Sequence, residues 1–206
     1  GYGDFSVFNN GLSETPCLDA LMSESVCLTQ FYSASPICAP ARAGFLTGRY
    51  PHRTGAIETR ELRGLCNLAL RETTIADLFK RSGYATGLVG KWHLGMSSRG
   101  HIPKGRGFDR SLVYFAGAED HITQRSCAGG WDKECILPIT NTTPFHPLPV
   151  KIPVPLPTVS PFDLWIDDGP ALPAAGSRHN GYQFNDFAVG AINALDLDAG
   201  PLFMYL

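Results

Sequence analysis

The apolar positions of this chain follow helical spacing in some stretches and extended spacing in others. Residues 184–195 place apolar side chains at helical intervals, which predicts an amphipathic helix. Three more helices are predicted after Thr15-Pro16, near Pro40, and from about Thr74 to Gly83. Strands are predicted at residues 26–32, at 84–90 and after Pro201. This alternation is typical of an α/β protein with a largely parallel sheet and helices on both faces.

Residues 138–173 interrupt this order, because ten of these 36 positions are proline. The alternating prolines between Pro153 and Pro157 favour polyproline II and exclude a central strand or helix. We therefore expect a surface loop here, with a peptide-like docking motif as the alternative.

The composition is that of a globular protein, with 44% hydrophobic and 17% charged residues. Its 206 residues suffice for one domain or at most two small ones. The formal net charge of −2 gives no sign of a nucleic-acid partner. No apolar run approaches the roughly 18 residues of a membrane span. The chain opens on Gly1 without a leader and stops inside the apolar run 201–206, so we expect it to be incomplete at both ends.

The six cysteines are too few for a small disulfide-stapled protein. Cys127 and Cys135 lie close enough in the chain to form a bridge, and Asn141-Thr142-Thr143 is a glycosylation acceptor. Together they favour the secretory pathway, lysosomal or extracellular, or the periplasm of a bacterium. The remaining cysteines other than Cys38 show no metal-ligand spacing, and we expect core residues or free thiols at Cys17, Cys27 and Cys66.

Cys38 opens the segment with the most chemistry, Cys38-Ala39-Pro40-Ala41-Arg42. Pro40 suits the first turn of a helix, so Cys38 falls at or just before the helix N-terminus, where free N–H groups attract an anion. Arg42, one turn later, can bind an oxyanion or steady the group at position 38. Taken alone, the segment equally fits a buried cysteine beside a surface arginine.

Lys91 and His93 follow the predicted strand 84–90. If the extended geometry continues, both side chains point to one side at the carboxyl end of the strand, where open α/β sheets bind ligands. A lysine can bind a tetrahedral anion, and a histidine can move protons near neutral pH. Each residue in isolation also fits a structural role, as a solvated strand end and as a hydrogen-bonded histidine.

The two segments together resemble the two signatures of the sulfatase family. Residues 38–49 resemble C-x-P-x-R followed by a T-G run, and residues 83–93 resemble G-Y-x-T-x-x-x-G-K-x-H. Residues 107–109 and 117–120 resemble the arylsulfatase B branch in particular. Further family patterns are matched at residues 1–4, 15–21 and 201–206.

This resemblance implies the alkaline-phosphatase-like fold and a sulfuric ester hydrolase that acts on sulfated sugars. Its nucleophile would be formylglycine, made from Cys38 by a formylglycine-generating enzyme. By matched position, Arg42 would hold the hydrated aldehyde, and Lys91 would bind the sulfate. His93 would take the proton that triggers release of sulfate. His121 is a further candidate for the substrate pocket.

The resemblance also implies calcium, or less often magnesium, bound by carboxylate oxygens and by the modified Cys38. The family's paired aspartates would precede Gly1, and its later Asp-Asn pair, leaving-group histidine and second lysine would follow Leu206. We therefore expect residues 1–206 to be part of a catalytic domain and inactive alone. Asp167-Asp168 resembles a metal pair only superficially, because it lies in the proline-rich segment and not after a strand.

Two other functions stay open. A phosphonate or phosphodiester hydrolase of the same superfamily can share the formylglycine signature. A non-catalytic relative would bind sulfated glycans without turnover. A serine- or threonine-dependent phosphate-transferring enzyme is disfavoured because Cys occupies position 38, whereas Ala41 in place of the usual serine is tolerated by the signature.

Overall fold

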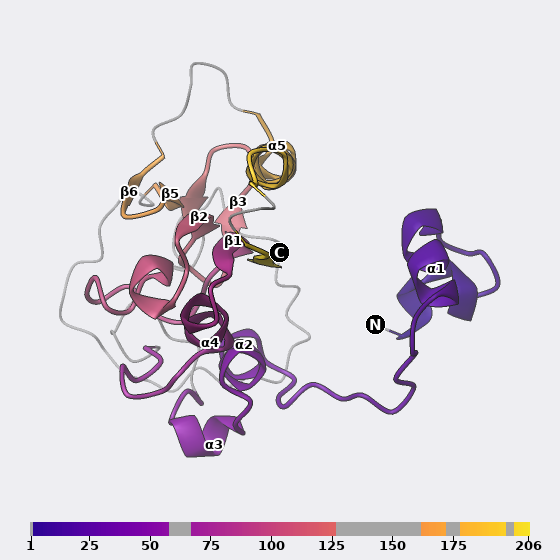
Figure 1. Cartoon of the computed structure of the whole chain (residues 1–206), viewed down its shortest axis with the longest axis horizontal. Helices are drawn as coiled ribbons and strands as arrows, with labels where there is room; N and C mark the ends of the chain where they lie inside the picture. The colour runs from indigo at the N-terminus through magenta and orange to yellow at the C-terminus, as the bar shows by residue number, and fades with distance from the viewer. Residues whose placement is uncertain (1, 58–66, 127–161, 172–177, 197–199) are drawn as a thin grey trace, which may run out of the picture. The chain divides into compact units, whose positions relative to one another are not determined.

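The computed structural model describes residues 2–57, 67–126, 162–171, 178–196 and 200–206 (Figure 1). The chain forms two compact units, Gly1–Tyr32 and Ser33–Leu206. Among the described residues, no helix has the length and apolar character needed to cross a membrane. Cys66, Cys127, Cys135 and Asn141 lie outside the described residues, so the expectations for them stay predictions.

The first unit contains the helix α1 (Pro16–Ser23) and two short 3-10 helices, η1 (Tyr2–Asp4) and η2 (Ser6–Phe8). Thr15 is the N-cap residue and proline occupies the first turn, which confirms the predicted helix start. The strand predicted at residues 26–32 was wrong. Val26 and Phe31 are 88% and 74% exposed, and no strand forms among residues 2–32 that could pair with this segment.

A mixed five-stranded sheet forms the centre of the second unit, in the order β6-β5-β2-β1-β7. β1 pairs in parallel with both β2 and β7, whereas the β2–β5 and β5–β6 pairs are antiparallel. The strands are β1 (Ala85–Lys91), β2 (Arg110–Tyr114), β5 (Leu164–Ile166), β6 (Gly169–Pro170) and β7 (Leu202–Tyr205). A separate small hairpin consists of β3 (Glu119–Asp120) and β4 (Arg125–Ser126). The strands predicted at 84–90 and after Pro201 are confirmed as β1 and β7.

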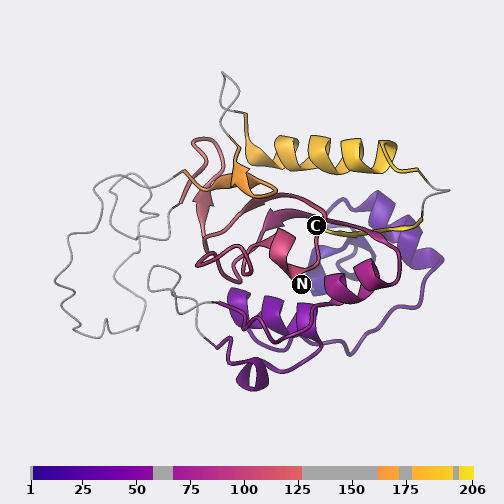
Figure 2. The same ribbon diagram turned by 60° about the vertical axis from the view of Figure 1, so that its left-hand side comes forward.

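Helices cover both faces of this sheet: Figure 2 shows α5 along one face and α2 and α4 along the other. Their bounds are α2 (Cys38–Thr47), α4 (Ile75–Arg81) and α5 (Asn180–Asn193), with the short α3 (Pro51–Thr54) and η4 (Pro103–Arg106) beside them. Thr74 caps α4 through a capping box with Asp77. The predicted helices and the α/β class are therefore confirmed.

The core of the second unit lies between the sheet and helices α2 and α4. Trp92 and Phe108 pack edge to face with ring centroids 6.2 Å apart, and both side chains are fully buried. Gly44 lets the segment that precedes α2 pack closely on the helix, because a Cβ at position 44 would come within 2.8 Å of the Ala34 Cβ. The Arg42 side chain of α2 donates to the Lys91 carbonyl oxygen at 2.7 Å, which fixes the helix against the end of β1.

Part of the proline-rich segment is ordered as strands, which corrects the loop prediction for residues 162–171. Leu164 is buried, and β5 adds to the sheet as an antiparallel partner of β2. Asp167 directly follows β5, so the expectation that it would not follow a strand was wrong. Its carboxylate accepts from the Ser111 N–H at 2.7 Å and pairs with Arg110 at 3.1 Å, which gives it a structural role. Residues 138–161 lie outside the described part.

Candidate active site

Cys38 is the first residue of helix α2, after the N-cap residue Ile37. The side chain of Ile37 cannot accept a hydrogen bond, so the first N–H groups of α2 are not capped by it. Cys38 is a partly buried free thiol. The predicted placement of this residue at a helix N-terminus is confirmed, and the helix dipole favours negative charge there.

Arg42 connects the helix to the carboxyl ends of two parallel strands. It lies one turn after Cys38 on α2, and its Nη1 donates to the Lys91 carbonyl oxygen at 2.7 Å. The same nitrogen lies 3.5 Å from the hydroxyl of Tyr205 on β7. The two signature segments thus meet at the sheet edge where parallel α/β sheets bind ligands.

Lys91 is the last residue of β1, and it is paired in register with Tyr114 of β2. Its ammonium group donates to the Gly117 carbonyl oxygen at 2.5 Å. Because this residue is only partly buried, its charge is available at the sheet edge. The arrangement suits the binding of a small anion.

His93 is held by backbone geometry that the sequence did not indicate. Its φ of 56° is left-handed, so the extended conformation expected after Lys91 does not continue through this residue. The side chain is 1% exposed. Burial, together with the positive charges of Lys91 and Arg42, lowers the pKa of His93 to about 4. Its imidazole is therefore neutral at pH 7.

Tyr114 links Cys38 to the same group of residues. Burial raises the pKa of its phenol, with Arg42 opposing this shift and Glu119, Asp163 and Cys38 adding to it. Cys38 and Arg42 thus lie within electrostatic range of this ring. The structure brings Arg42, Lys91 and His93 together, while the anion pocket that would join them to Cys38 stays a prediction.

His121 follows β3 and lies beside the site. Its ring packs edge to face against Tyr114, with centroids 5.9 Å apart, and its side chain is 43% exposed. Since Tyr114 is the register partner of Lys91, His121 borders the sheet edge that carries the candidate site. The position fits the expected role in substrate binding, which stays a prediction.

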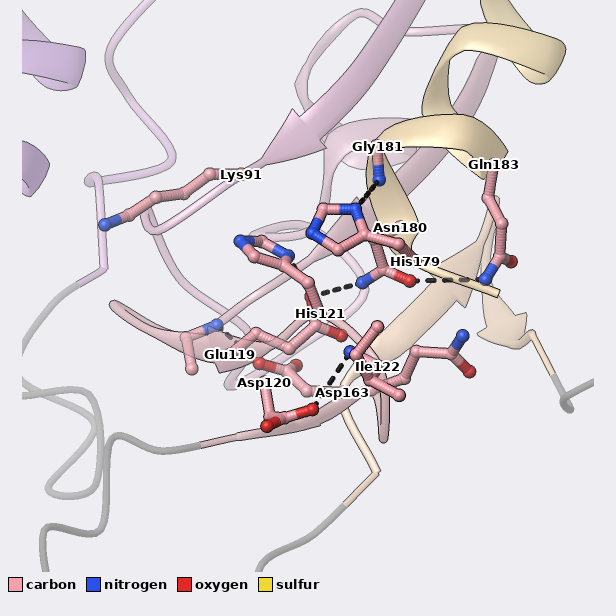
Figure 3. Close-up of polar contacts among 12 residues, drawn as sticks. Lys91, Glu119, Asp120, His121, Ile122, Asp163, His179, Asn180, Gly181 and Gln183 are labelled. Atoms are coloured by element: carbon pink, nitrogen blue, oxygen red, sulfur yellow. Dashed lines mark hydrogen bonds and ion pairs between the residues drawn. The ribbon is translucent and has the colours of Figure 1, made fainter. Parts of the chain in front are cut away.

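A buried polar cluster next to His121 was not found from the sequence (Figure 3). The carboxyl group of Glu119 is fully buried and accepts from the Asn180 amide at 2.7 Å. Burial, with the nearby Asp163 charge, raises the pKa of Glu119 to about 8, although the Asn180 hydrogen bond opposes the shift. Because 61 residues separate the partners, no local pattern could have paired them.

Asp163 fixes the backbone at the end of β2. Its two carboxylate oxygens accept from the N–H groups of Phe115 and Ala116, at 3.0 and 2.9 Å. Burial nevertheless raises its pKa. The sequence placed this residue in a proline-rich loop and gave no signal for its role.

The described residues do not form a metal centre. Among them, no group of three or more His, Cys, Asp or Glu side chains could hold a metal ion. Calcium prefers six to eight oxygen ligands, and Cys38 alone cannot supply them. The expected calcium or magnesium therefore stays a prediction, and no step below passes through it.

The sulfatase family model matches residues 1–206. The chain therefore belongs to the sulfatase family. Mouse steryl-sulfatase is 46% identical over 123 residues, which cover 54% of this chain and 20% of that enzyme. Human arylsulfatase D is 43% identical over 134 residues, covering 60% of this chain and 22% of that protein.

The fold agrees with solved structures. The crystal structure of Ps i-CgsB aligns with a TM-score of 0.72 at 24% identity, covering 100% of this chain and 42% of that one. This likeness confirms the predicted fold class. The chain spans 42% of that structure, and its matches span about a fifth of the curated relatives. The finer placement beside arylsulfatase B stays a prediction.

Proposed function

We propose that the full-length protein is a sulfuric ester hydrolase, with residues 1–206 forming part of its catalytic domain. Membership of the sulfatase family supports this proposal. One observation carries it: the Arg42 side chain, from the first turns of α2, hydrogen-bonds the Lys91 carbonyl at 2.7 Å. This contact brings two segments that lie 49 residues apart in the chain to one sheet edge.

In the proposed reaction, a formylglycine made from Cys38 supplies a hydrated aldehyde with two hydroxyl groups. One hydroxyl attacks the sulfate sulfur, the S–O bond to the ester alcohol breaks, and the alcohol leaves with a proton. Arg42 holds the attacking hydroxyl group, because its guanidinium lies one turn along α2 and forks onto oxygen. Lys91 binds the sulfate and counters the negative charge that grows on its oxygens. Both side chains act from rigid elements, so little reorganisation is needed as the ester bond breaks.

His93 acts as the general base in this proposal. Its pKa of about 4 keeps the imidazole neutral at pH 5 and above but makes it a weak base, and a bound sulfate would strengthen it by offsetting the charges of Lys91 and Arg42. A neutral imidazole can take the proton whose loss expels sulfate and restores the aldehyde. The positive neighbours that keep it neutral, Lys91 and Arg42, are the groups that bind the anion.

The modification of Cys38 tests this proposal directly. The full-length protein is expressed with a formylglycine-generating enzyme, and the peptide containing Cys38 is examined by mass spectrometry. We expect the thiol sulfur to be replaced by a carbonyl oxygen, and we expect aryl sulfate hydrolysis. Cys38→Ala should abolish turnover, whereas Cys27→Ala, at an exposed thiol of the first unit, should not. Unmodified Cys38 in active expression conditions contradicts the proposal.

The same assay separates the alternative functions. A phosphonate or phosphodiester hydrolase would carry the modification but prefer phosphorus esters. A non-catalytic sulfatase-like protein would bind sulfated glycans and hydrolyse neither class. The neutral His93 and the cations Lys91 and Arg42 at the carboxyl end of β1 favour turnover over binding alone.

We infer that the substrate is a sulfated sugar and that the protein enters the secretory pathway, or the periplasm in a bacterium. The sugar is supported by the polar side chains that border the site, His121 among them. The partner during maturation would be the formylglycine-generating enzyme. Microscopy of the tagged full-length protein, with removal of N-glycans as a check on Asn141, tests the compartment.

A further inference from the structure

Two imidazole rings lie side by side next to the candidate active site. His121 follows β3, and His179 is the N-cap residue of α5. Their ring centroids are 5.2 Å apart. In Figure 3 the ring of His121 lies on the Lys91 side of His179. Since His121 also packs on Tyr114, the register partner of Lys91, the pair borders the edge where the sulfate would bind.

The hydrogen bond at the helix start fixes the chemistry of His179. Its Nδ1 accepts from the Gly181 N–H at 3.0 Å, so this nitrogen carries a lone pair. In a neutral imidazole the other nitrogen then carries the proton. Nε2 of His179 is therefore a hydrogen-bond donor, on a residue that is exposed. It can donate to an oxygen acceptor on a bound molecule.

Glu119 and Asn180 hold the two histidines in place from beneath. The Asn180 amide donates to the Glu119 carboxyl at 2.7 Å, and the Asn180 backbone N–H donates to the His121 carbonyl at 2.9 Å. Asn180 is fully buried. Asn180 thus fixes the backbone of His121 directly and is the chain neighbour of His179. The other oxygen of Glu119, Oε1, makes no hydrogen bond within the described part of the chain.

The charges around the pair favour an electron-rich ligand. Burial keeps the pKa of Glu119 near 8, so the carboxyl 3.9 Å from the His121 Nδ1 is mostly uncharged at pH 7. Asp120 is engaged by the N–H groups of Ile122 and Thr123, at 2.9 and 2.6 Å. The buried carboxyl therefore adds little negative charge beneath the rings, whereas the Lys91 ammonium points away from them and donates to the Gly117 carbonyl oxygen.

An exposed aromatic ring completes this surface. Tyr182 of α5 is 60% exposed, lies 6.4 Å from the His179 ring centroid, and carries the Arg178 guanidinium over its face at 4.9 Å. Arg178 covers one face of this ring and is itself paired with Asp186, so the imidazoles are the donors left for sugar oxygens, with the other face of Tyr182 beside them. A steroid ring system offers these donors no oxygen acceptor, so it gains nothing from them.

We propose that His121 and His179 are specificity-determining residues that bind oxygen acceptors of the sugar carrying the sulfate ester. Glu119 and Asn180 are positioning residues that set the spacing of the two rings. This inference rests on the proposed sulfatase function and names the residues that choose the substrate. It predicts a preference for sulfated sugars over steryl sulfate.

The test compares substrates in the full-length protein. His121→Ala and His179→Asn are assayed with a sulfated N-acetylhexosamine and with 4-nitrophenyl sulfate. Asn retains the N-cap function of position 179 and removes the imidazole donor. We expect the ratio of kcat/KM for the sugar to that for the aryl ester to fall about tenfold per histidine, the scale of one hydrogen bond. His52→Ala, at an exposed histidine stacked on Tyr50, is the control and should keep the ratio.

The positioning role has its own readout. Glu119→Gln keeps a neutral acceptor for the Asn180 amide and should preserve the ratio, whereas Glu119→Ala should lower it through KM. Equal losses on both substrates, or an unchanged ratio in both histidine variants, would overturn the inference. If the wild-type protein hydrolyses no sulfate ester, the proposed function fails by itself. Calorimetric titration with the sulfated sugar then decides: weaker binding by His179→Asn supports the sugar site, and equal binding overturns it.

Discussion

At the scale of single residues, the site depends on a few contacts between residues that lie far apart in the sequence. Arg42 reaches the Lys91 carbonyl and approaches the Tyr205 hydroxyl with one nitrogen. His93 is neutral because burial and two cations oppose its protonation. Each of these side chains is placed by a different element, so each can be tested separately.

We predict that Arg42→Lys lowers kcat for aryl sulfate hydrolysis about 100-fold or more, the usual cost of removing one positioned donor from a transition state. A lysine retains the charge but lacks the fork that can reach two acceptors. Mass spectrometry must first show that Cys38 is still modified, since Arg42→Ala is expected to block modification as well. Arg53→Lys, at an exposed position, is the matched control. Full activity of Arg42→Lys would remove Arg42 from the mechanism.

We predict that His93→Gln lowers kcat by about 10² to 10⁴, the range for loss of a general base. Glutamine fills similar space but cannot take a proton, so KM should change much less than kcat. Steady-state kinetics with 4-nitrophenyl sulfate measure both. The control is His101→Gln, whose imidazole hydrogen-bonds Ser98 at 2.8 Å in an exposed segment. A large rise in KM with unchanged kcat would instead assign His93 to binding.

At the scale of elements, the fold holds the site through close backbone approaches and one buried joint. Gly107, just after η4, lies against the start of α4, and Glu119 joins the β3–β4 hairpin to α5. The Gly107 approach and the Glu119 hydrogen bond hold elements together and take no part in the proposed reaction. Their loss should therefore affect stability before chemistry.

We predict that Gly107→Ala destabilises the protein by about 1–3 kcal/mol or more. The residue has a left-handed φ of 91°, and a Cβ would lie 2.4 Å from the Asp77 nitrogen and 2.7 Å from the Ala76 carbonyl carbon. Thermal unfolding of the full-length protein measures the effect. Gly190→Ala in α5 meets no atom within 4 Å and should be neutral or mildly stabilising. Equal melting temperatures for Gly107→Ala and the wild type would contradict this packing.

We predict that Glu119 makes stability fall as the pH rises from about 4.5 to about 8. In this window the folded state keeps the Glu119 proton while the unfolded chain, with the ordinary pKa of 4.5, releases it. The folded state binds more protons, so raising the pH favours unfolding. Glu119→Gln removes this term, and its stability relative to wild type should improve by at least about 1.4 kcal/mol, one pKa unit, between pH 5 and pH 9. Denaturant titrations of both proteins at pH 5 and pH 9 measure this effect. If the difference in unfolding free energy between Glu119→Gln and the wild type is the same at both pH values, the prediction is wrong.

At the scale of the whole molecule, the described residues bring Arg42, Lys91 and His93 together but form no metal centre. No group of three or more metal-ligating side chains exists among them. The matches to curated relatives span about a fifth of those proteins, so much of each relative lies beyond the aligned part. The expected calcium ligands therefore stay a prediction.

We predict that residues 1–206 expressed alone bind calcium weakly or not at all and hydrolyse no aryl sulfate. Position 38 can supply only part of the six to eight oxygen ligands that calcium prefers. Calorimetric titration with calcium and a 4-nitrophenyl sulfate assay measure both properties, with the full-length protein as the positive control. Tight stoichiometric binding by residues 1–206 would show that the metal site lies within this chain.

The sequence by itself determined the elements and the family, because helical spacing, capping residues and two long signatures are local patterns. It placed Cys38 at a helix start and Lys91 at a strand end, as the structure confirms. It misjudged residues 26–32 and 162–171, because strand formation depends on whether a partner lies alongside. Only the tertiary structure decided the left-handed turn at His93 and the Glu119–Asn180 pair. Both depend on contacts between segments far apart in the chain. Burial in these contacts also decides whether His93 and Glu119 carry a charge, which the local sequence does not encode.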